Sequence, residues 1–131
     1  MVKHLYVHVP FCKSICYYCD FCHRVYDSSL VSKWLTRLEK EIKDNCDNQY
    51  ETIYIGGGTP SCLCDDELEF LLKLIKPYTN NVVEYTIEVN PDSLSKNKID
   101  IFKKYHINRI SMGVQSSNSD ELVFMNRKYD F

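Results

Sequence analysis

The sequence predicts an α/β fold in which parallel strands form a partial (β/α) barrel. Strand-like and helix-like segments alternate along the whole chain, in units of about 30 residues, an order typical of parallel strands joined by right-handed crossovers. The predicted strands also carry apolar side chains on one face and polar side chains on the other. A doubly wound sheet, which helices cover on both faces, should be apolar on both.

Four segments have the period-two alternation of a strand. They are residues 5–9, 52–56 (TIYIG), 83–89 (VEYTIEV) and 107–115 (INRISMGVQ). Taking alternate positions, the face expected to pack under helices carries Leu5, Val7, Val9, Ile53, Ile55, Val83, Tyr85, Ile87, Val89, Ile110, Met112 and Val114. The opposite face carries Tyr6, His8, Tyr54, Gly56, Glu84, Thr86, Glu88, Arg109, Ser111, Gly113 and Gln115. This polar face is expected to line the inside of a partial barrel, whose site lies at the C-terminal ends of the strands.

Apolar residues at helical spacing predict the connections between the strands. The first helix follows possible caps at residues 27–29 and has as its inner positions Val31, Trp34, Leu35, Leu38 and Ile42. The second follows Asp65 and Asp66, ends at Pro77 and turns inward Leu68, Leu71, Leu72 and Ile75. A third helix is expected over residues 95–105, and a fourth over residues 118–127 with Leu122 and Met125 inside.

The length of the chain limits how much of a barrel it can form. A complete barrel takes about 200 residues or more, and this chain has 131. We therefore expect residues 1–131 to form a single partial domain of the first four βα units, with the later strands and a C-terminal domain absent. The open strand edges of such a piece favour association, for instance as a homodimer.

Composition excludes several classes of function. The chain has 16 Lys and Arg residues against 18 Asp and Glu residues and no basic run, so nucleic acid is not expected as its partner. The first ten residues lack the apolar block of a signal peptide. No segment approaches the roughly 20 apolar residues of a membrane helix. These features together predict a cytoplasmic protein.

The cysteines are the unusual feature of the composition. The chain has seven, and in a cytoplasmic protein thiols stay reduced, which favours metal or redox roles over disulfides. Cys12, Cys16 and Cys19 form a CxxxCxxC pattern, which Cys22 extends. Three thiolates at this spacing can bind three irons of a [4Fe-4S] cluster and leave the fourth iron open to another ligand. A structural zinc site with four thiolates is the alternative, because zinc ribbons also use paired cysteines.

Several segments carry a specific resemblance to a known family. Residues 5–21 (LYVHVPFCKSICYYCDF) are followed by IGGGTPS at 55–61, IEVNP at 87–91, RISMGVQS at 109–116 and an Asn-Arg pair at 126–127. In this order they resemble the barrel-strand motifs of the oxygen-independent coproporphyrinogen III oxidase-like radical-SAM family, which includes haem chaperones related to that oxidase. The resemblance covers nearly the whole chain and implies the N-terminal part of a radical-SAM partial (β/α) barrel.

The resemblance also implies roles for single residues. Cys12, Cys16 and Cys19 would ligate the cluster, and no residue is assigned as catalytic beyond the cofactor's own chemistry. Tyr6 and Tyr18 would flank S-adenosylmethionine. Cys22 keeps no assigned role.

Three motif positions match a glycine turn, in which the lack of side chains lets the backbone approach the methionyl amino group of the cofactor; these are Gly57, Gly58 and Thr59. Glu88 and Gln115 match polar contacts to the cofactor. Arg127 matches an arginine that pairs with a carboxylate, for which its rigid fork of donors is suited. Without the resemblance, the glycine run reads as an ordinary turn, Glu88 as a solvated carboxylate and Arg127 as a surface charge.

Two activities are compatible with this family. The resemblance implies that the cluster passes an electron to S-adenosylmethionine and generates a 5'-deoxyadenosyl radical. In the oxidase this radical leads to decarboxylation of coproporphyrinogen III, whereas the chaperone branch binds haem and delivers it. The position of Cys22 and the start of the chain directly at its first strand favour the haem chaperone branch, with a tetrapyrrole as partner; the oxidase is the alternative and a zinc module the most remote reading.

Overall fold

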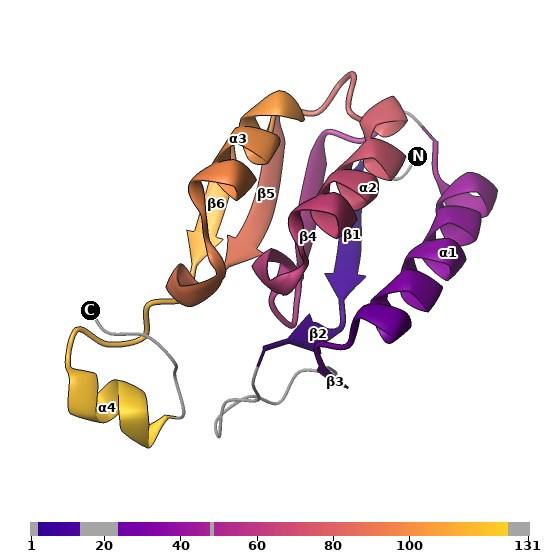
Figure 1. Ribbon diagram of the computed structural model, residues 1–131. Helices are drawn as coiled ribbons and strands as arrows, with labels where there is room; N and C mark the ends of the chain where they lie inside the picture. The colour runs from indigo at the N-terminus through magenta and orange to yellow at the C-terminus, as the bar shows by residue number, and fades with distance from the viewer. Residues whose placement is uncertain (1–2, 14–23, 48, 126–131) are drawn as a thin grey trace.

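The computed structural model describes residues 3–13, 24–47 and 49–125 (Figure 1). Its strands are β1 (His4–Val9), β2 (Phe11–Cys12), β3 (Arg24–Val25), β4 (Thr52–Gly57), β5 (Glu84–Val89) and β6 (Arg109–Met112). Its α-helices are α1 (Ser28–Asn45), α2 (Asp65–Ile75), α3 (Lys96–Lys104) and α4 (Ser119–Phe124). Three short 3-10 turns are η1 (Pro60–Cys62), η2 (Lys76–Tyr78) and η3 (Pro91–Ser93).

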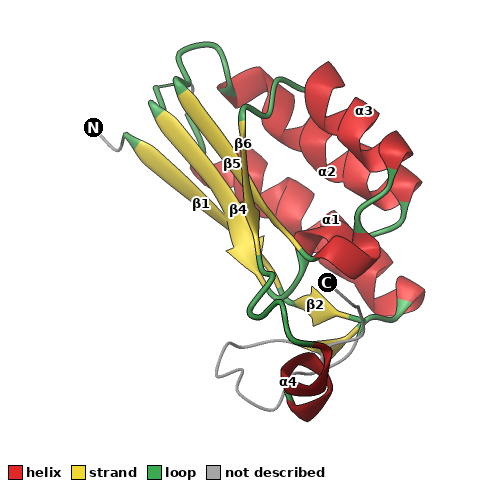
Figure 2. Ribbon diagram, turned by 90° about the vertical axis from the view of Figure 1, so that its left-hand side faces the viewer, coloured by secondary structure: helices red, strands yellow, loops and turns green. Residues whose placement is uncertain are grey.

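Four strands form one parallel sheet in the order β1-β4-β5-β6. Because the order in the sheet follows the order in the chain, the connections wind in a single direction. Helices α1, α2 and α3 all lie on one face of this sheet (Figure 2). The arrangement confirms the predicted α/β fold with parallel strands and excludes a doubly wound sheet over these residues.

The core lies between the sheet and the three helices. The apolar strand face and the inner stripe of α2 meet there, and Ile55, Ile87, Leu68, Leu71 and Ile75 have no exposed surface. From α1 the core receives Val31, Leu35 and Ile42, and from α3 it receives Ile101 and Phe102. The helical periodicity in the sequence therefore identified the buried side of α1 and of α2.

Three residues of the predicted apolar face are exposed instead. Val83 precedes β5 and is 75% exposed, while Ile110 and Met112 on β6 are 43% and 45% exposed. The expectation that helices cover them is wrong for this structure. β6 lies at the edge of the sheet, and α4 lies beyond the strand ends and not over β6 (Figure 1).

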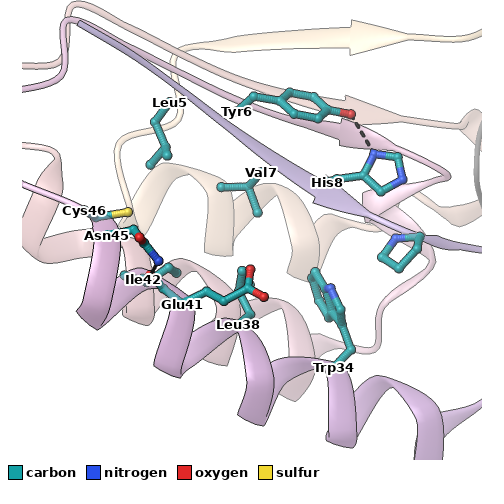
Figure 3. A pocket seen from close by; sticks show the side chains of 11 residues that line it. Leu5, Tyr6, Val7, His8, Trp34, Leu38, Glu41, Ile42, Asn45 and Cys46 are labelled. Atoms are coloured by element: carbon teal, nitrogen blue, oxygen red, sulfur yellow. Dashed lines mark hydrogen bonds between the residues drawn. The ribbon is translucent and has the colours of Figure 1, made fainter. Parts of the chain in front are cut away.

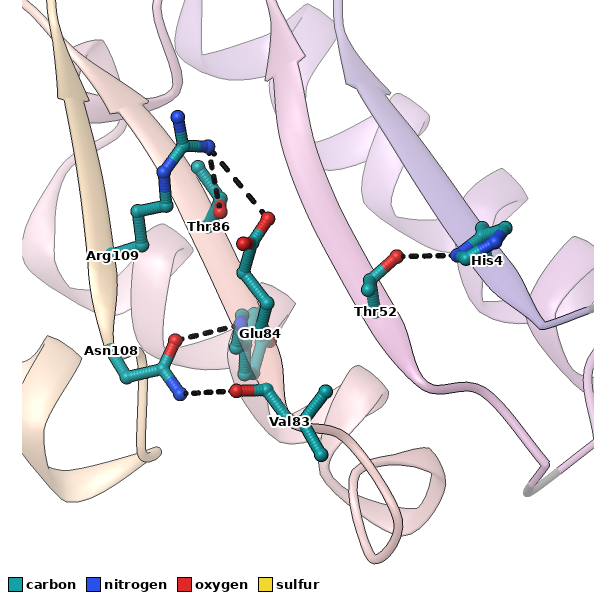
Figure 4. Close-up of polar contacts among 8 residues, drawn as sticks. His4, Thr52, Val83, Glu84, Thr86, Asn108 and Arg109 are labelled. Carbon is teal, nitrogen blue, oxygen red and sulfur yellow. Dashed lines mark hydrogen bonds and ion pairs between the residues drawn. The ribbon is translucent and has the colours of Figure 1, made fainter.

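The other face of the sheet is polar, as predicted, and its side chains pair with one another (Figure 4). Nη1 of Arg109 lies 3.8 Å from Oε1 of Glu84 and donates to Oγ1 of Thr86 at 3.4 Å. Asn108 extends the pairing of β5 with β6, since its side chain accepts from the Tyr85 amide and donates to the Val83 carbonyl. These contacts stabilise a face that α1, α2 and α3 leave open.

Side-chain caps account for the starts of the helices. Asp27 caps α1 by accepting from the amides of Ser29 and Leu30, and Ser95 caps α3 by accepting from the amide of Lys98. For α2 the N-cap is Cys64, with Glu67 accepting from the Cys64 amide, so Asp65 and Asp66 lie in the first turn. Negative charge there interacts favourably with the helix dipole.

Candidate active site

The C-terminal ends of β1, β4 and β5 meet at one edge of the sheet (Figure 2). Cys12 follows β1, Gly57 ends β4 and Glu88 is the second-last residue of β5. Parallel strands bring these positions together although they are far apart in the sequence. The candidate site therefore lies at the C-terminal ends of these strands, where the sequence predicted it.

A small two-stranded sheet holds the start of the cysteine segment in place. β2 and β3 pair in parallel, and the Cys12 carbonyl accepts from the amide of Tyr26 at 2.6 Å. The Pro10 carbonyl likewise accepts from the amide of Arg24 at 2.6 Å. These bonds fix Cys12, which is buried, next to the end of β1. Cys16, Cys19, Cys22 and Tyr18 lie outside the described residues.

The glycine turn packs directly against the backbone that leads to Cys12. The amide of Gly58 donates to the Val9 carbonyl at 2.7 Å, and the amide of Thr59 donates to the Phe11 carbonyl at 2.6 Å. Gly57 has φ +111°, and a Cβ there would lie 2.9 Å from the Val9 carbonyl oxygen. A Cβ on Gly58 would lie 2.5 Å from the Phe11 carbonyl oxygen. The turn thus requires glycine at both positions.

Glu88 is bound to this turn and does not extend freely into solvent. Its Oε1 accepts from the amide of Gly57 at 3.0 Å. A Cβ on Gly56 would lie 2.0 Å from the same oxygen, so the third glycine leaves room for the carboxylate. The structure therefore brings Glu88 and Gly57 together, and the reading of Glu88 as a merely solvated carboxylate does not describe it.

Tyr6 projects from the polar face of β1. Its ring stacks on Tyr54 with centroids 6.1 Å apart, and its hydroxyl hydrogen-bonds Nδ1 of His8 at 2.8 Å. Burial, together with the Glu88 carboxylate and Tyr54, raises the pKa of Tyr6. His8, which the strand pattern placed on the polar face, is thus hydrogen-bonded to another residue of that face.

The remaining predicted contacts lie farther along the chain. Gln115 was expected at the end of a strand over residues 107–115, but β6 ends at Met112, and Gln115 is exposed with φ +70°. Few non-glycine residues adopt a positive φ, and those that do are concentrated at functional sites. Arg127 lies outside the described residues.

Two further cysteines lie near the site. Cys62 belongs to η1, and Cys64 is the N-cap residue of α2. Burial, with Cys12 nearby, raises the pKa of the Cys62 thiol to about 12. Its Sγ donates to the Phe11 carbonyl at 3.3 Å. Cys62 is therefore a buried thiol with a structural partner.

A polar cluster next to Cys12 is not evident from the sequence pattern. Buried and partly buried hydrogen bonds connect η1 with η3; the residues that form them are Ser61, Asn90, Ser93 and Lys98. Asn90 lies within the IEVNP motif, and an Asn-Pro pair after a strand signals a turn. That signal marks the place of the turn but not the partner of the Asn90 side chain.

A groove of about 410 Å³ lies elsewhere, between β1 and α1 (Figure 3). Its lining is mainly apolar and includes Leu5, Val7, Trp34 and Leu38. Cys46 lines it near Leu5, at the start of β1, whereas Cys12 follows the end of that strand. Cys46 is thus not part of the strand-end site.

The described part of the chain contains some of the residues expected to hold a cluster and its cofactor. They include no group of three His, Cys, Asp or Glu side chains placed to hold a metal ion, and of the three proposed ligands only Cys12 is among them. The donor chemistry fits a cluster at Cys12, because thiolates are the usual ligands of such clusters and this thiol lies beside the glycine turn. The glycines let the turn pack closely against the chain that leads to Cys12, because a Cβ on Gly57 or Gly58 would meet the backbone of Val9 or Phe11. Within the same residues, no helix has the length and apolar character needed to span a membrane.

Comparison with known proteins identifies the family. The model of the radical SAM superfamily matches residues 6–131. The heme chaperone HemW of Bacillus subtilis is 39% identical over 96% of this chain and 35% of its own length. The oxygen-independent coproporphyrinogen III oxidase of Salmonella typhimurium is 32% identical over 96% of this chain and 29% of its own length.

A solved structure gives the same result. Coproporphyrinogen III oxidase (HemN) from Escherichia coli, described as a radical SAM enzyme, superposes with a TM-score of 0.85 and 30% identity, covering 98% of this chain and 31% of that one. The chain spans about a third of the length of these relatives. The resemblance found in the sequence motifs is confirmed, and this chain belongs to the radical SAM superfamily.

Proposed function

We propose that this chain binds a [4Fe-4S] cluster through Cys12, Cys16 and Cys19 and binds S-adenosylmethionine at the remaining iron. One observation supports this most strongly: buried Cys12 lies beside a turn whose Gly57 and Gly58 cannot accept a Cβ. The glycines allow the turn to pack against the backbone that leads to Cys12, and cysteine thiolates are the usual ligands of iron-sulfur clusters. When bound, the cluster supplies the electron that cleaves the cofactor's sulfonium.

The residues of the chain would bind and orient the cofactor. Gly57, Gly58 and Thr59 would let it approach the backbone. Glu88 keeps the turn in place through the Gly57 amide and offers a second carboxylate oxygen. Tyr6, held by stacking on Tyr54, would cover one side of the cofactor. Contacts from Tyr18, Gln115 and Arg127 complete the proposal and rest on their motif positions alone.

For the biological role we propose haem handling of the heme chaperone type. Among the proteins compared, the heme chaperone HemW of B. subtilis is 39% identical to this chain, against 32% for the S. typhimurium oxidase. Decarboxylation of coproporphyrinogen III is the second candidate, because the E. coli oxidase superposes on almost the whole chain. Both roles take a tetrapyrrole as partner.

Anaerobic reconstitution with iron and sulfide tests the cluster. We expect about four irons per chain and an EPR signal that changes when S-adenosylmethionine is added. Cys12→Ala should abolish both, whereas Cys62→Ala, which removes a neighbouring buried thiol, should retain them. Uptake of zinc without iron, or equal loss in both variants, would refute the proposal.

A haem titration of the wild-type chain distinguishes the two roles. We expect a Soret band that saturates at one haem per chain and no conversion of coproporphyrinogen III. Conversion without haem binding would instead support the oxidase activity.

A further inference from the structure

We propose that Thr59 sets the reduction potential of the cluster by donating its hydroxyl proton to Cys12 Sγ, and that Asn90 holds the hydroxyl in that direction. This inference rests on the proposed function, since it requires Cys12 to be a cluster ligand. It assigns the Thr59 side chain and Asn90 a role in addition to cofactor binding by the turn.

The hydrogen bonds at Thr59 define the direction of its proton. Oγ1 of Thr59 lies 3.4 Å from Sγ of Cys12, and both residues are buried. Nδ2 of Asn90 lies 3.1 Å from the same Oγ1. An amide nitrogen can only donate, so Thr59 accepts from Asn90 with a lone pair. Its own proton is then available for the sulfur.

A closed ring of hydrogen bonds fixes Asn90. The backbone amide of Asn90 donates to Oγ of Ser61 at 3.1 Å, and the backbone carbonyl of Asn90 accepts from Oγ of Ser93 at 3.2 Å. Because the hydroxyl proton of Ser93 is used in the bond to that carbonyl, the Ser61 hydroxyl is the donor in the 2.5 Å bond between the two serine oxygens. Nζ of Lys98 donates to the carbonyls of Ser61 at 2.6 Å and Ser93 at 2.9 Å, which braces both turns.

A donor at a ligating sulfur affects the two redox states unequally. The reduced cluster carries one more negative charge than the oxidised cluster. A hydrogen bond to the thiolate is stronger when the sulfur is more negative, so it stabilises the reduced state. Hydrogen bonds to cluster sulfurs are one of the main determinants of these potentials. Thr59 should therefore raise the potential.

Redox titration of the reconstituted chain with dithionite, followed by EPR, tests the inference. Thr59→Val replaces the hydroxyl by a methyl group, and we expect the equilibrium constant for one-electron reduction to fall about tenfold, about 59 mV. Thr59→Ser, which keeps the donor, should retain the wild-type potential. Asn90→Leu should lower it in the same direction. Thr86→Val makes the same change at another buried threonine and should have no effect.

The outcomes separate this inference from the proposed function. If the wild-type chain takes up no cluster, both are refuted. If it loads normally and Thr59→Val has the wild-type potential, only the inference is refuted. Should Thr59→Val fail to fold, Thr59→Ala removes the same donor without adding a methyl group and must show the same shift. A shift in Thr59→Ser as large as in Thr59→Val would also refute the role of the hydroxyl.

Discussion

Gly57 is the residue on which the geometry of the strand-end site most depends. With φ +111° it lies in a region that L side chains rarely adopt. Gly57→Ala should destabilise the chain by about 1–3 kcal/mol, because it combines backbone strain with contact against the Val9 carbonyl. Urea unfolding followed by circular dichroism measures the change.

Gly56→Ala is the matched comparison for this prediction. Its Cβ would meet the side chains of Glu88 and Tyr54, which can rotate away, and its φ is not positive. It should cost less than Gly57→Ala. A Gly57→Ala chain as stable as the wild type, or less affected than Gly56→Ala, would contradict this account of the turn.

At the scale of single residues, the sequence predicted which residue types gather at the site better than how they contact one another. Strand parity placed Tyr6 and Glu88 on the polar face, and the structure confirms this. The bond from Thr59 to Cys12 could not be foreseen. Periodicity assigns a side chain to a face, whereas a hydrogen bond also depends on a rotamer and on the register of two distant turns.

Helix α3 ends in a Schellman motif that carries a histidine at its left-handed position. The amide of Ile107 donates to the Phe102 carbonyl, the amide of His106 donates to the Lys103 carbonyl, and His106 has φ 65°. His106→Gly should stabilise the chain by about 0.5–1 kcal/mol, because glycine adopts this conformation without a Cβ penalty. His106→Ala, which keeps the Cβ, should show no such gain in thermal unfolding. Equal stability of the two variants would contradict the prediction.

An exposed ion pair connects α2 with the end of α3. Lys104 and the Tyr105 hydroxyl bind Glu69, and these hydrogen bonds hold the pKa of its carboxyl below the usual range. The unfolded chain therefore takes up this proton first as the pH falls. The stabilisation is complete above the ordinary value of 4.5 and is lost as the pH falls through the lower folded pKa.

Glu69→Gln tests this pH dependence. The variant should be less stable than the wild type at pH 7, and the difference in urea midpoint should shrink below about pH 4. In a Lys104→Met background the pH dependence of the substitution should be smaller. A difference between Glu69→Gln and wild type that is constant from pH 7 to pH 3 would exclude the carboxylate as its cause.

At the scale of elements, long amphipathic segments were predicted well and short strands were not. α1 and α2 have three or more turns with a continuous apolar stripe, so their positions agree closely with the sequence patterns. β2 and β3 have two residues each, too few to show any alternation. β6 ends at Met112, and the amide of Gly113 still donates to the Val89 carbonyl at the end of β5. The alternation of the sequence continues to Gln115, so the pattern alone predicted a longer strand.

For the molecule as a whole, one apolar face and one polar face sufficed to predict that helices cover a single side of the sheet. The sequence could not show that β6 would remain exposed, because the cover of an edge strand depends on where the following helix lies and not on the strand's own pattern. Ile110 and Met112 on β6 and Val123 and Phe124 on α4 are accordingly exposed apolar side chains.

The exposed edge of β6 predicts concentration-dependent self-association of this chain. Within the described residues β6 pairs only with β5, so its outer backbone groups can pair with another chain, and the exposed Ile110 and Met112 beside them add apolar surface. Sedimentation velocity over a concentration series should show the sedimentation coefficient rising with concentration. Ile110→Lys should suppress the rise, because charge on an edge strand opposes pairing. Val83→Lys adds the same charge at a more exposed apolar position outside the edge strand, so it should leave association intact. Equal suppression by both lysines would mean that net charge, and not the β6 edge, controls association.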